Sequence, residues 1–307
     1  MRNAFADEIT KLAGKDERIV LLPGDIGNRL FDNYKGKFPD RFYNCGVAEA
    51  NLVSMAAGMA LCGLRPIGYT ITPFITSRCF EQIRVDVCYN NLPVVTVAVG
   101  SGFGYASLGA THHSCEDIAI MRVIPNMTVI CPGDAFEVRA AIRAALKHDG
   151  PVYLRIGKKN EPLVHKDVPE FEIGKGIIIH EGNDVCLLST GNMLPIAVEA
   201  GKKLSNQGTS TQVVSLHTVK PLDAELLSKI FEKFKLIVTI EEHSLLGGLG
   251  SAVSEWLVDN ISDKAKLLRI GTNDVFLHKV GEQEYARKQF GLTAEAITKK
   301  VLDNYNK

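Results

Sequence analysis

A single carboxylate stands where a buried helix should begin, in the segment NCGVAEANLVSMAAGMALCG at 44–63. Glu49 falls in the first turn of this helix, and the residues that follow it are mostly small or apolar. A first-turn carboxylate is favoured by the helix dipole by about 0.3–1 kcal/mol, which is one explanation for it. The apolar neighbours leave little room for solvent, however, and a buried carboxylate needs a cation, a donor or a ligand. Glu49 is therefore a candidate acid–base group.

Two further segments carry side chains that could bind a ligand. The segment 68–93 places Phe74 in a loop after a strand and Phe80 in the following helix, where aromatic rings serve either a core or a binding pocket. The Gly-rich segment SGFGYASLGATHHS ends in His112 and His113, immediately before another helix. Histidines at a helix N-terminus suit an anion or a carbonyl group, although a surface loop can have the same composition.

Neither of two possible metal patterns is convincing. Cys115 follows the histidine pair closely, but the chain offers no second ligand cluster near it. GDIG at 24–27, followed by Asn51, resembles a Gly-Asp-Gly…Asn site for magnesium diphosphate, yet Ile26 replaces the third residue of that pattern. Asn51 would also share one helix with the candidate carboxylate. We therefore expect no metal ligands on this chain.

The elements that must position these groups alternate between strand and helix. Short runs rich in Val, Ile and Leu predict strands at 18–22, 41–44, 66–70, 93–99, 127–131, 152–156, 185–189, 212–216, 236–240 and 266–270. Amphipathic or apolar patterns predict helices at 4–13, 48–62, 77–89, 116–123, 135–147, 194–205, 224–234, 250–258 and 294–305, with Asp134 as the N-cap of the fifth. Near-continuous apolar strands are typical of parallel sheets that are covered on both faces.

The alternation lapses in the charged, proline-containing segment GKKNEPLVHKDVPEFEIGKG, which we interpret as a linker. This divides the chain into a first domain at 1–157, a linker at 158–175 and a second domain at 176–307. The predicted fold class is α/β, with two doubly wound and mostly parallel-sheet domains.

Composition narrows the functional classes. The 307 residues are 46% hydrophobic and 23% charged, and Lys+Arg and Asp+Glu both number 35, so the net charge is zero. Zero net charge gives no electrostatic case for binding nucleic acid or an anionic membrane. The chain has no run of eighteen apolar residues, and its N-terminus lacks the apolar centre of a signal peptide. The seven cysteines form no CxxC pair, so we expect reduced thiols and a cytoplasmic protein.

Five motifs together resemble one family in their order and spacing. They are G-V-A-E at 46–49, G-L-R-P at 63–66, F-x-x-x-R-C-F-E-Q-I-R at 74–84, G-x-T-H-H at 109–113 and I-P-N-M at 124–127. The family is that of the transketolases, through its pyrimidine-binding domain, and the residues after about 172 resemble its C-terminal domain. The pattern is most similar to the separate C-terminal subunits of split transketolases. Deoxyxylulose phosphate synthase shares several of the motifs.

The resemblance implies that the cofactor is thiamine diphosphate. In this family, the glutamate that matches Glu49 hydrogen-bonds the aminopyrimidine ring and favours the tautomer that removes the thiazolium proton. Phe74 and Phe80 match aromatic residues of the pyrimidine pocket, and Asp25 matches an aspartate close to the cofactor. His112 matches the histidine that faces the carbonyl and hydroxyl groups of the substrate. Shielding from water would strengthen the hydrogen bond of the carboxylate and let a proton be shared.

The same resemblance assigns substrate-binding positions. Arg2 and Arg155 match arginines that hold a sugar phosphate, a task that suits the bidentate guanidinium group. Arg29 is a looser candidate in the loop after the first strand. Two family residues that contact substrate hydroxyl groups are replaced here by Leu108 and Gly100, which argues against assuming the ordinary pentose phosphate substrates.

Another departure concerns the cofactor platform, because Ser77 stands where transketolases often have a stacking Phe. The family also binds the diphosphate and its Mg²⁺ in an N-terminal domain, and nothing in these residues replaces that domain. The resemblance therefore implies half of a composite site, shared with an N-terminal transketolase-like subunit. A homodimer through the pyrimidine-binding domain would then complete a two-plus-two heterotetramer.

These observations predict the C-terminal subunit of a thiamine-diphosphate-dependent enzyme that moves a two-carbon ketol unit between sugars or sugar phosphates. One alternative is an acyl-transferring relative, either of the deoxyxylulose phosphate synthase type or the beta subunit of a 2-oxoacid dehydrogenase. Another is a non-catalytic partner that stabilises a second enzyme. The presence of Glu49 and His112 argues against the last alternative, because a purely structural subunit has no need of them.

Overall fold

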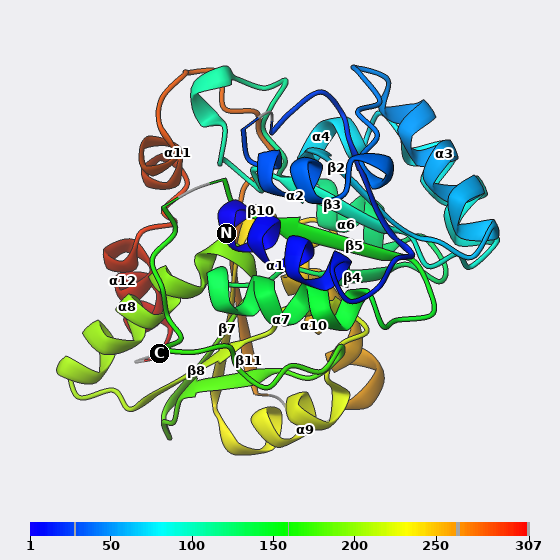
Figure 1. Ribbon diagram of the computed structural model, residues 1–307. Helices are drawn as coiled ribbons and strands as arrows, with labels where there is room; N and C mark the ends of the chain where they lie inside the picture. Colours follow the sequence, from blue (N-terminus) through cyan, green and yellow to red (C-terminus); the bar gives the residue numbers. More distant parts are fainter. Residues whose placement is uncertain (28, 159, 262–264, 306–307) are drawn as a thin grey trace.

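Two mostly parallel sheets organise the chain (Figure 1). The computed structural model describes residues 1–27, 29–158, 160–261 and 265–305. Each of the three predicted segments (1–157, 158–175 and 176–307) includes residues outside this description. The first sheet has six strands in the order β1 (Ile19–Pro23), β2 (Arg65–Ile71), β3 (Val95–Val99), β5 (Val152–Ile156), β4 (Thr128–Ile130) and β9 (Thr218–Lys220).

Helices cover both faces of this first sheet. They are α1 (Arg2–Ala13), α2 (Asp32–Lys37), α3 (Glu49–Leu61), α4 (Thr72–Ile75), α5 (Phe80–Gln82), α6 (Asp117–Arg122) and α7 (Ala135–Ala145), with a π-helical segment η2 (Ile83–Tyr89) and 3₁₀ turns η1 (Pro39–Arg41) and η3 (Ala106–Leu108). α1 and α7 pack side by side (Figure 1). Successive strand residues serve opposite faces: Leu21 packs with the α1 and α7 core, and Leu22 with the core that contains α3.

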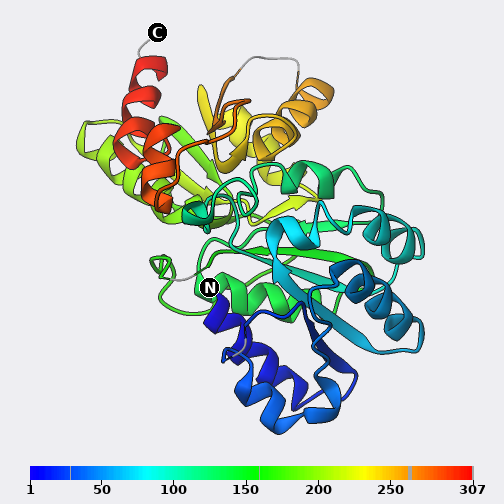
Figure 2. The same cartoon turned by 90° about the horizontal axis from the view of Figure 1, so that it is seen from above.

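The second domain is also a mostly parallel sheet with helices packed against it. Its five strands lie in the order β11 (Lys266–Thr272), β10 (Leu236–Ser244), β7 (Val185–Ser189), β8 (Thr211–Ser215) and β6 (Ile177–His180). Its helices are η4 (Gly191–Met193), α8 (Leu194–Asn206), α9 (Ala224–Lys233), α10 (Leu249–Asn260), α11 (Gln283–Gln289) and α12 (Ala294–Tyr305). Figure 2 shows this domain beside the first one, so that the two halves share a long boundary.

A strand pairing and a set of hydrogen bonds join the first domain to the later part of the chain. β9 comes from the second half of the chain but pairs antiparallel with β4 of the first sheet. Asp134 caps α7 by accepting hydrogen bonds from Phe136 and Glu137, as predicted, and its other carboxylate oxygen accepts the N–H groups of Val164 and His165 in the linker. The linker is therefore docked on the first domain by backbone hydrogen bonds.

The predicted fold class is confirmed, with an antiparallel edge strand added to each sheet. The strand predicted at 41–44 is wrong, because Phe42 makes only a single bridge with Leu21. The helix predicted at 77–89 divides into α5 and η2, which ends at Tyr89. Sequence patterns missed the short strands β6 and β9 and the helices α2 and α11. None of the described helices is long and apolar enough to cross a membrane.

Candidate active site

Glu49 is the first residue of α3 and is buried, with 2% of its surface exposed. Its Oε2 atom lies 2.7 Å from an Nη1 atom of Arg78, whose side chain is 46% exposed. The charge of Arg78 therefore offsets the desolvation cost of the buried carboxylate, and it does so from the solvent side. The sequence predicted that a buried Glu49 needs a partner, and the structure supplies Arg78.

The loop before α3 is held by a reciprocal pair of hydrogen bonds. Asp25 donates its N–H to Oδ1 of Asn44, and the amide of Asn44 donates back to Oδ1 of Asp25. Gly46, at φ 65°, donates its N–H to the same Oδ1 atom. Asp25 is exposed and itself has φ 54°. Its observed contacts therefore shape the entrance to α3, three residues before Glu49.

A continuous row of rings and cations extends from this carboxylate. The guanidinium of Arg78 lies 4.3 Å from the ring centroid of Phe74. That ring meets the imidazole of His112 edge-on at 5.1 Å, and His112 lies 6.1 Å from the ring of Tyr105. Nζ of Lys158 lies 4.3 Å from the Tyr105 centroid. The structure therefore brings Glu49, Phe74 and His112, which together span more than sixty residues of sequence, into one row.

His112 is half-buried within this row. Burial lowers the pKa of His112, and the charges of His113 and Lys158 lower it further, so the neutral imidazole is favoured. Its Nδ1 atom lies 2.9 Å from Oγ1 of Thr111. A neutral ring that is fixed in this way can donate or accept one hydrogen bond at its free nitrogen, which is what a carbonyl or a hydroxyl group requires.

Two cations stand at the far end of the row, and sequence analysis had selected only one of them. Arg2, at the start of α1, lies near the Tyr105 hydroxyl: burial raises the pKa of Tyr105, and the charge of Arg2 opposes that rise. Lys158 was assigned to the linker. Its position just after the predicted strand at 152–156 is the signal that could have found it, because ligands often bind at the carboxyl ends of parallel strands.

Gly100 accounts for one departure from the family pattern. It has φ 85°, and a Cβ atom there would lie 2.1 Å from Cδ2 of Tyr105. Any side chain at this position would therefore displace the Tyr105 ring. Leu108, the other departure, is 53% exposed at the end of η3. Neither Gly100 nor Leu108 therefore offers a polar side chain to a substrate hydroxyl group.

The prediction that Arg155 holds a substrate phosphate is wrong for this structure. Its side chain is 1% exposed and forms a bidentate pair with Asp117, with N–O distances of 2.6 and 3.1 Å. The same guanidinium donates to the carbonyl oxygens of Ser114 and Glu242. Its Nη1 atom is buried and has no hydrogen-bond partner among the described residues. Because the guanidinium is buried and its Nε and Nη2 atoms bind protein groups, Arg155 serves the interior of the chain.

Two other predicted residues are not brought into the row. Phe80 is half-buried and packs on the core cluster that contains α3 and η2, so its role in a cofactor pocket stays a prediction. Ser77 is exposed beside it. Arg29 is exposed in the turn before α2, and within the described ranges no hydrogen bond or ion pair joins its side chain to the row. The described residues also contain no group of three His, Cys, Asp or Glu side chains that could hold a metal ion.

The surroundings of Glu49 fit a flat nitrogen heterocycle such as an aminopyrimidine. The hydroxyl of Thr70 is buried and has no hydrogen-bond partner. A Cβ atom on Gly24 would lie 3.1 Å from this hydroxyl and 3.4 Å from Cγ of Glu49, so the glycine keeps the space beside the carboxylate open. An unpaired polar atom, a buried carboxylate and the nearby Phe74 ring are the groups that such a ring requires.

Comparisons with known proteins place this geometry in a family. Residues 1–162 match the family "Transketolase, pyrimidine binding domain", and residues 174–297 match "Transketolase, C-terminal domain". The chain therefore belongs to the transketolase family, as its motifs predicted.

Within that family, the chain is similar over its length to C-terminal subunits of split enzymes. It is 39% identical to a putative transketolase C-terminal section of Methanocaldococcus jannaschii, covering 100% of this chain and 96% of that protein. It is 38% identical to a 6-deoxy-6-sulfo-D-fructose transketolase subunit of a Clostridium species, covering 97% and 92%. A solved structure, described as a split gene transketolase in an inactive β4 tetramer, superposes with a TM-score of 0.90 at 37% identity, covering 99% of this chain and 97% of that one.

Proposed function

We propose that the chain is the C-terminal subunit of a thiamine-diphosphate-dependent, transketolase-like enzyme that transfers a two-carbon ketol unit between sugars or sugar phosphates. The observation that carries this proposal is the row that begins at the buried Glu49 and passes through Phe74 and His112 to Arg2. It offers, in order, a proton-sharing carboxylate, an aromatic wall, a neutral imidazole and a cation. Such an order suits a heterocyclic cofactor at one end and an acidic sugar at the other.

Each residue then has a definite task. When bound, thiamine diphosphate supplies the carbon that cleaves and reforms the bond next to the ketose carbonyl. Glu49 shares a proton with the pyrimidine ring, and its burial keeps water from competing for that hydrogen bond. Arg78 balances the carboxylate charge from the exposed side. Phe74 forms an apolar wall, and the neutral His112 hydrogen-bonds the carbonyl or hydroxyl oxygen of the substrate.

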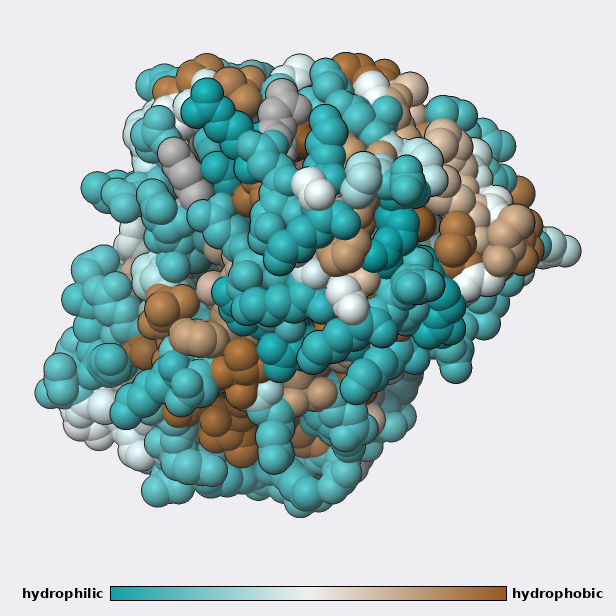
Figure 3. All heavy atoms as spheres, viewed as in Figure 1, coloured by the Kyte–Doolittle hydropathy of each residue, from teal (hydrophilic) through white to brown (hydrophobic). Residues whose placement is uncertain are grey.

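The proposal assigns the diphosphate and Mg²⁺ to an N-terminal partner subunit, as the similarity to split transketolases suggests. It also assigns the first domain to a homodimer interface. Val47 and Leu61 are exposed at the two ends of α3, by 75% and 70%, and Figure 3 shows apolar surface gathered over this helix. An exposed apolar surface of this kind marks a contact with another chain. We place the enzyme in the cytoplasm, in agreement with its seven free cysteines.

Reconstitution tests the proposed reaction. The chain alone should bind thiamine diphosphate weakly and show no turnover, whereas the chain mixed with its N-terminal partner should consume a ketose donor and transfer two carbons to an aldose. A panel of ketose donors, assayed with and without pyruvate, separates the alternatives. Pyruvate consumption with release of CO₂ would identify an acyl-transferring relative. Micromolar cofactor binding by the pure chain, measured by calorimetry, would contradict the shared site.

The cation Arg2 leads to a prediction about substrate charge. Changing Arg2 to Gln should raise the KM for a phosphorylated sugar by about 10- to 100-fold, because a charge-assisted hydrogen bond contributes roughly 1.5–3 kcal/mol. The KM for the unphosphorylated analogue should change by less than about threefold. Arg18→Gln is the matched control, since Arg18 is paired with Asp16 at an exposed position. Equal losses for both sugars would remove Arg2 from this role.

A further inference from the structure

The loop that carries His112 is fastened at its base by the second domain. This loop, residues 101–114, is closed by a bridge between Gly102 and Ser114, in which the N–H of Ser114 donates to the carbonyl of Gly102 at 2.9 Å. The N–H of Phe103 donates a hydrogen bond across the domain boundary, to Oε1 of Glu242 at 2.7 Å. Glu242 lies on β10, 139 residues further along the chain.

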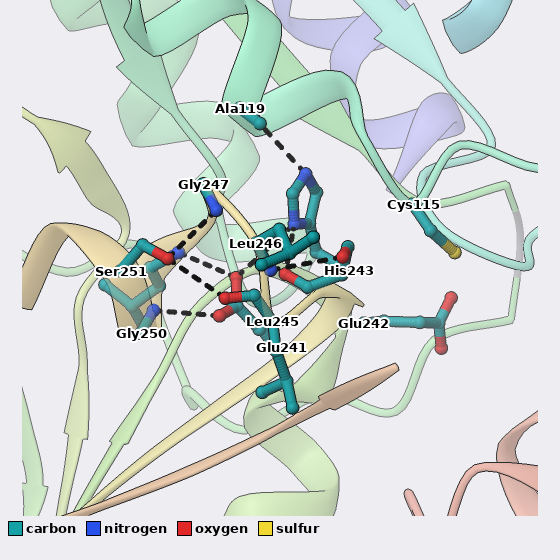
Figure 4. Close-up of polar contacts among 12 residues, drawn as sticks. Cys115, Ala119, Glu241, Glu242, His243, Leu245, Leu246, Gly247, Gly250 and Ser251 are labelled. Atoms are coloured by element: carbon teal, nitrogen blue, oxygen red, sulfur yellow. Dashed lines mark hydrogen bonds and ion pairs between the residues drawn. The ribbon is translucent and has the colours of Figure 1, made fainter. Parts of the chain in front are cut away.

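Glu242 is buried and is surrounded by donors. Its Oε1 atom also accepts from the amides of Asn192 and Gln283, at 3.1 and 2.8 Å, and its Oε2 atom is paired with Arg287. Figure 4 shows its carboxylate extending away from that of Glu241, the preceding strand residue. Glu241 accepts the first N–H groups of α10 at Leu249 and Gly250, which is a structural cap. Glu241 thus caps a helix of its own domain, whereas Glu242 binds groups of both domains.

The fit between Glu242 and the loop is close. A Cβ atom on Gly102 would lie 2.3 Å from Oε1 of Glu242, so the glycine is required for the carboxylate to approach. On the other side, the ring of Phe103 stacks on Phe290 of the second domain at 5.4 Å and contacts His113 edge-on at 5.3 Å. The residue before His113 is His112. A shift of the Phe103 backbone is thus transmitted to the histidine pair through one ring contact.

The buried Arg155 provides a second link between the loop and Glu242; these links together are called the clamp below. One of its Nη2 bonds reaches the carbonyl of Ser114, at the other end of the loop, and another reaches the carbonyl of Glu242 itself. The start of the loop is therefore bonded directly to the Glu242 side chain, and its end is linked to the Glu242 carbonyl through Arg155. Such double fixation holds a loop side chain within a narrow range of positions.

We propose that Glu242 is a positioning residue, which holds the loop of the first domain so that His112 meets the substrate; this role rests on the function proposed above. The second domain then contributes to the substrate half of the site without touching the substrate. The cofactor half should be independent of it, because Glu49 comes from α3 and is balanced by Arg78. A small misplacement of a contacting group can reduce a rate by about 100-fold, so the effect should be measurable.

A test compares Glu242→Ala with Glu255→Ala. Glu255 is a matched control because it also pairs with an arginine across the domain boundary, Arg122, but lies away from the loop. In the chain alone, Glu242→Ala should speed amide hydrogen exchange in residues 102–114 by at least about tenfold, measured by mass spectrometry. In the complex with the partner, kcat/KM for the ketose donor should fall about 10- to 100-fold, with exchange at the thiazolium carbon changed less than about threefold.

Glu242→Gln keeps the size of the side chain and one acceptor for Phe103, so it should show smaller changes in the same direction. If Glu242→Ala does not fold, the same measurements on Glu242→Gln test the proposal. The proposal is overturned if loop exchange in the Glu242 variants equals that of Glu255→Ala, or if thiazolium exchange falls as far as kcat/KM. An inactive wild-type complex would instead contradict the proposed function, while loop exchange would still report on the clamp.

Discussion

Replacing Glu49 by Gln should reduce turnover of the assembled enzyme by about two orders of magnitude or more, the scale expected for a lost acid–base group. Gln keeps the length and the hydrogen-bonding capacity of the side chain but cannot carry the carboxylate charge. The stability of the chain should change by only about 1 kcal/mol, because Arg78 is 46% exposed and is solvated when its partner is neutral. Steady-state kinetics and urea unfolding measure the two quantities.

Glu8→Gln is the matched control for this change. Glu8 is also a buried glutamate, 3% exposed, and it pairs with Arg139 and Arg143 between α1 and α7. Because it lies outside the row, its substitution should cost stability but leave turnover unchanged. If Glu49→Gln likewise lost stability and kept its turnover, the carboxylate would be only a first-turn partner of the helix dipole.

Replacing Arg155 by Ala should destabilise the protein by about 3–5 kcal/mol, as expected when one partner of a buried ion pair is removed. Asp117 would lose both hydrogen bonds from Arg155 and keep the one from the Tyr153 hydroxyl, at 2.5 Å. Any rise in KM should be the same for a phosphorylated sugar and its unphosphorylated analogue, because the guanidinium is not exposed to ligand. Chemical denaturation and substrate kinetics on the same variant separate the two effects.

Arg65→Ala provides the comparison, since Arg65 pairs with Asp149, whose side chain is 91% exposed. Exposed pairs contribute roughly 0–1 kcal/mol, so this variant should unfold close to the wild-type midpoint. An Arg155 variant that kept its stability and lost affinity only for phosphorylated sugars would restore the role that sequence matching had suggested for this arginine.

Arg155 also shows where sequence reasoning stops. The resemblance places an arginine near the end of the strand at 152–156, but whether its side chain turns inward depends on Asp117, which lies 38 residues away on another element. The pairing of Arg78 with Glu49 was also missed, because this side chain reaches a buried carboxylate that lies 29 residues away on another element. Both errors concern pairings between distant segments, which spacing along one segment does not encode.

The elements themselves were more accessible to prediction. Apolar strand runs and helix periodicity identified the main strands and helices because parallel strands that are buried on both faces are nearly continuous in apolar residues. β9 escaped because its three residues, Thr218–Lys220, are too short to show a pattern, and its partner β4 belongs to the other half of the chain. The contact of Glu242 with Phe103 escaped for the same reason, since it requires the two domains to be assembled.

Hydrogen–deuterium exchange at the thiazolium carbon of thiamine diphosphate tests the central claim most directly. The rate, followed by NMR in the complex of chain and partner, isolates the proton transfer that Glu49 is proposed to support, before any sugar is added. The wild-type and Glu8→Gln complexes should exchange at the same rate, and Glu49→Gln should exchange at least about 100-fold more slowly. Wild-type exchange in the Glu49→Gln complex would contradict the account.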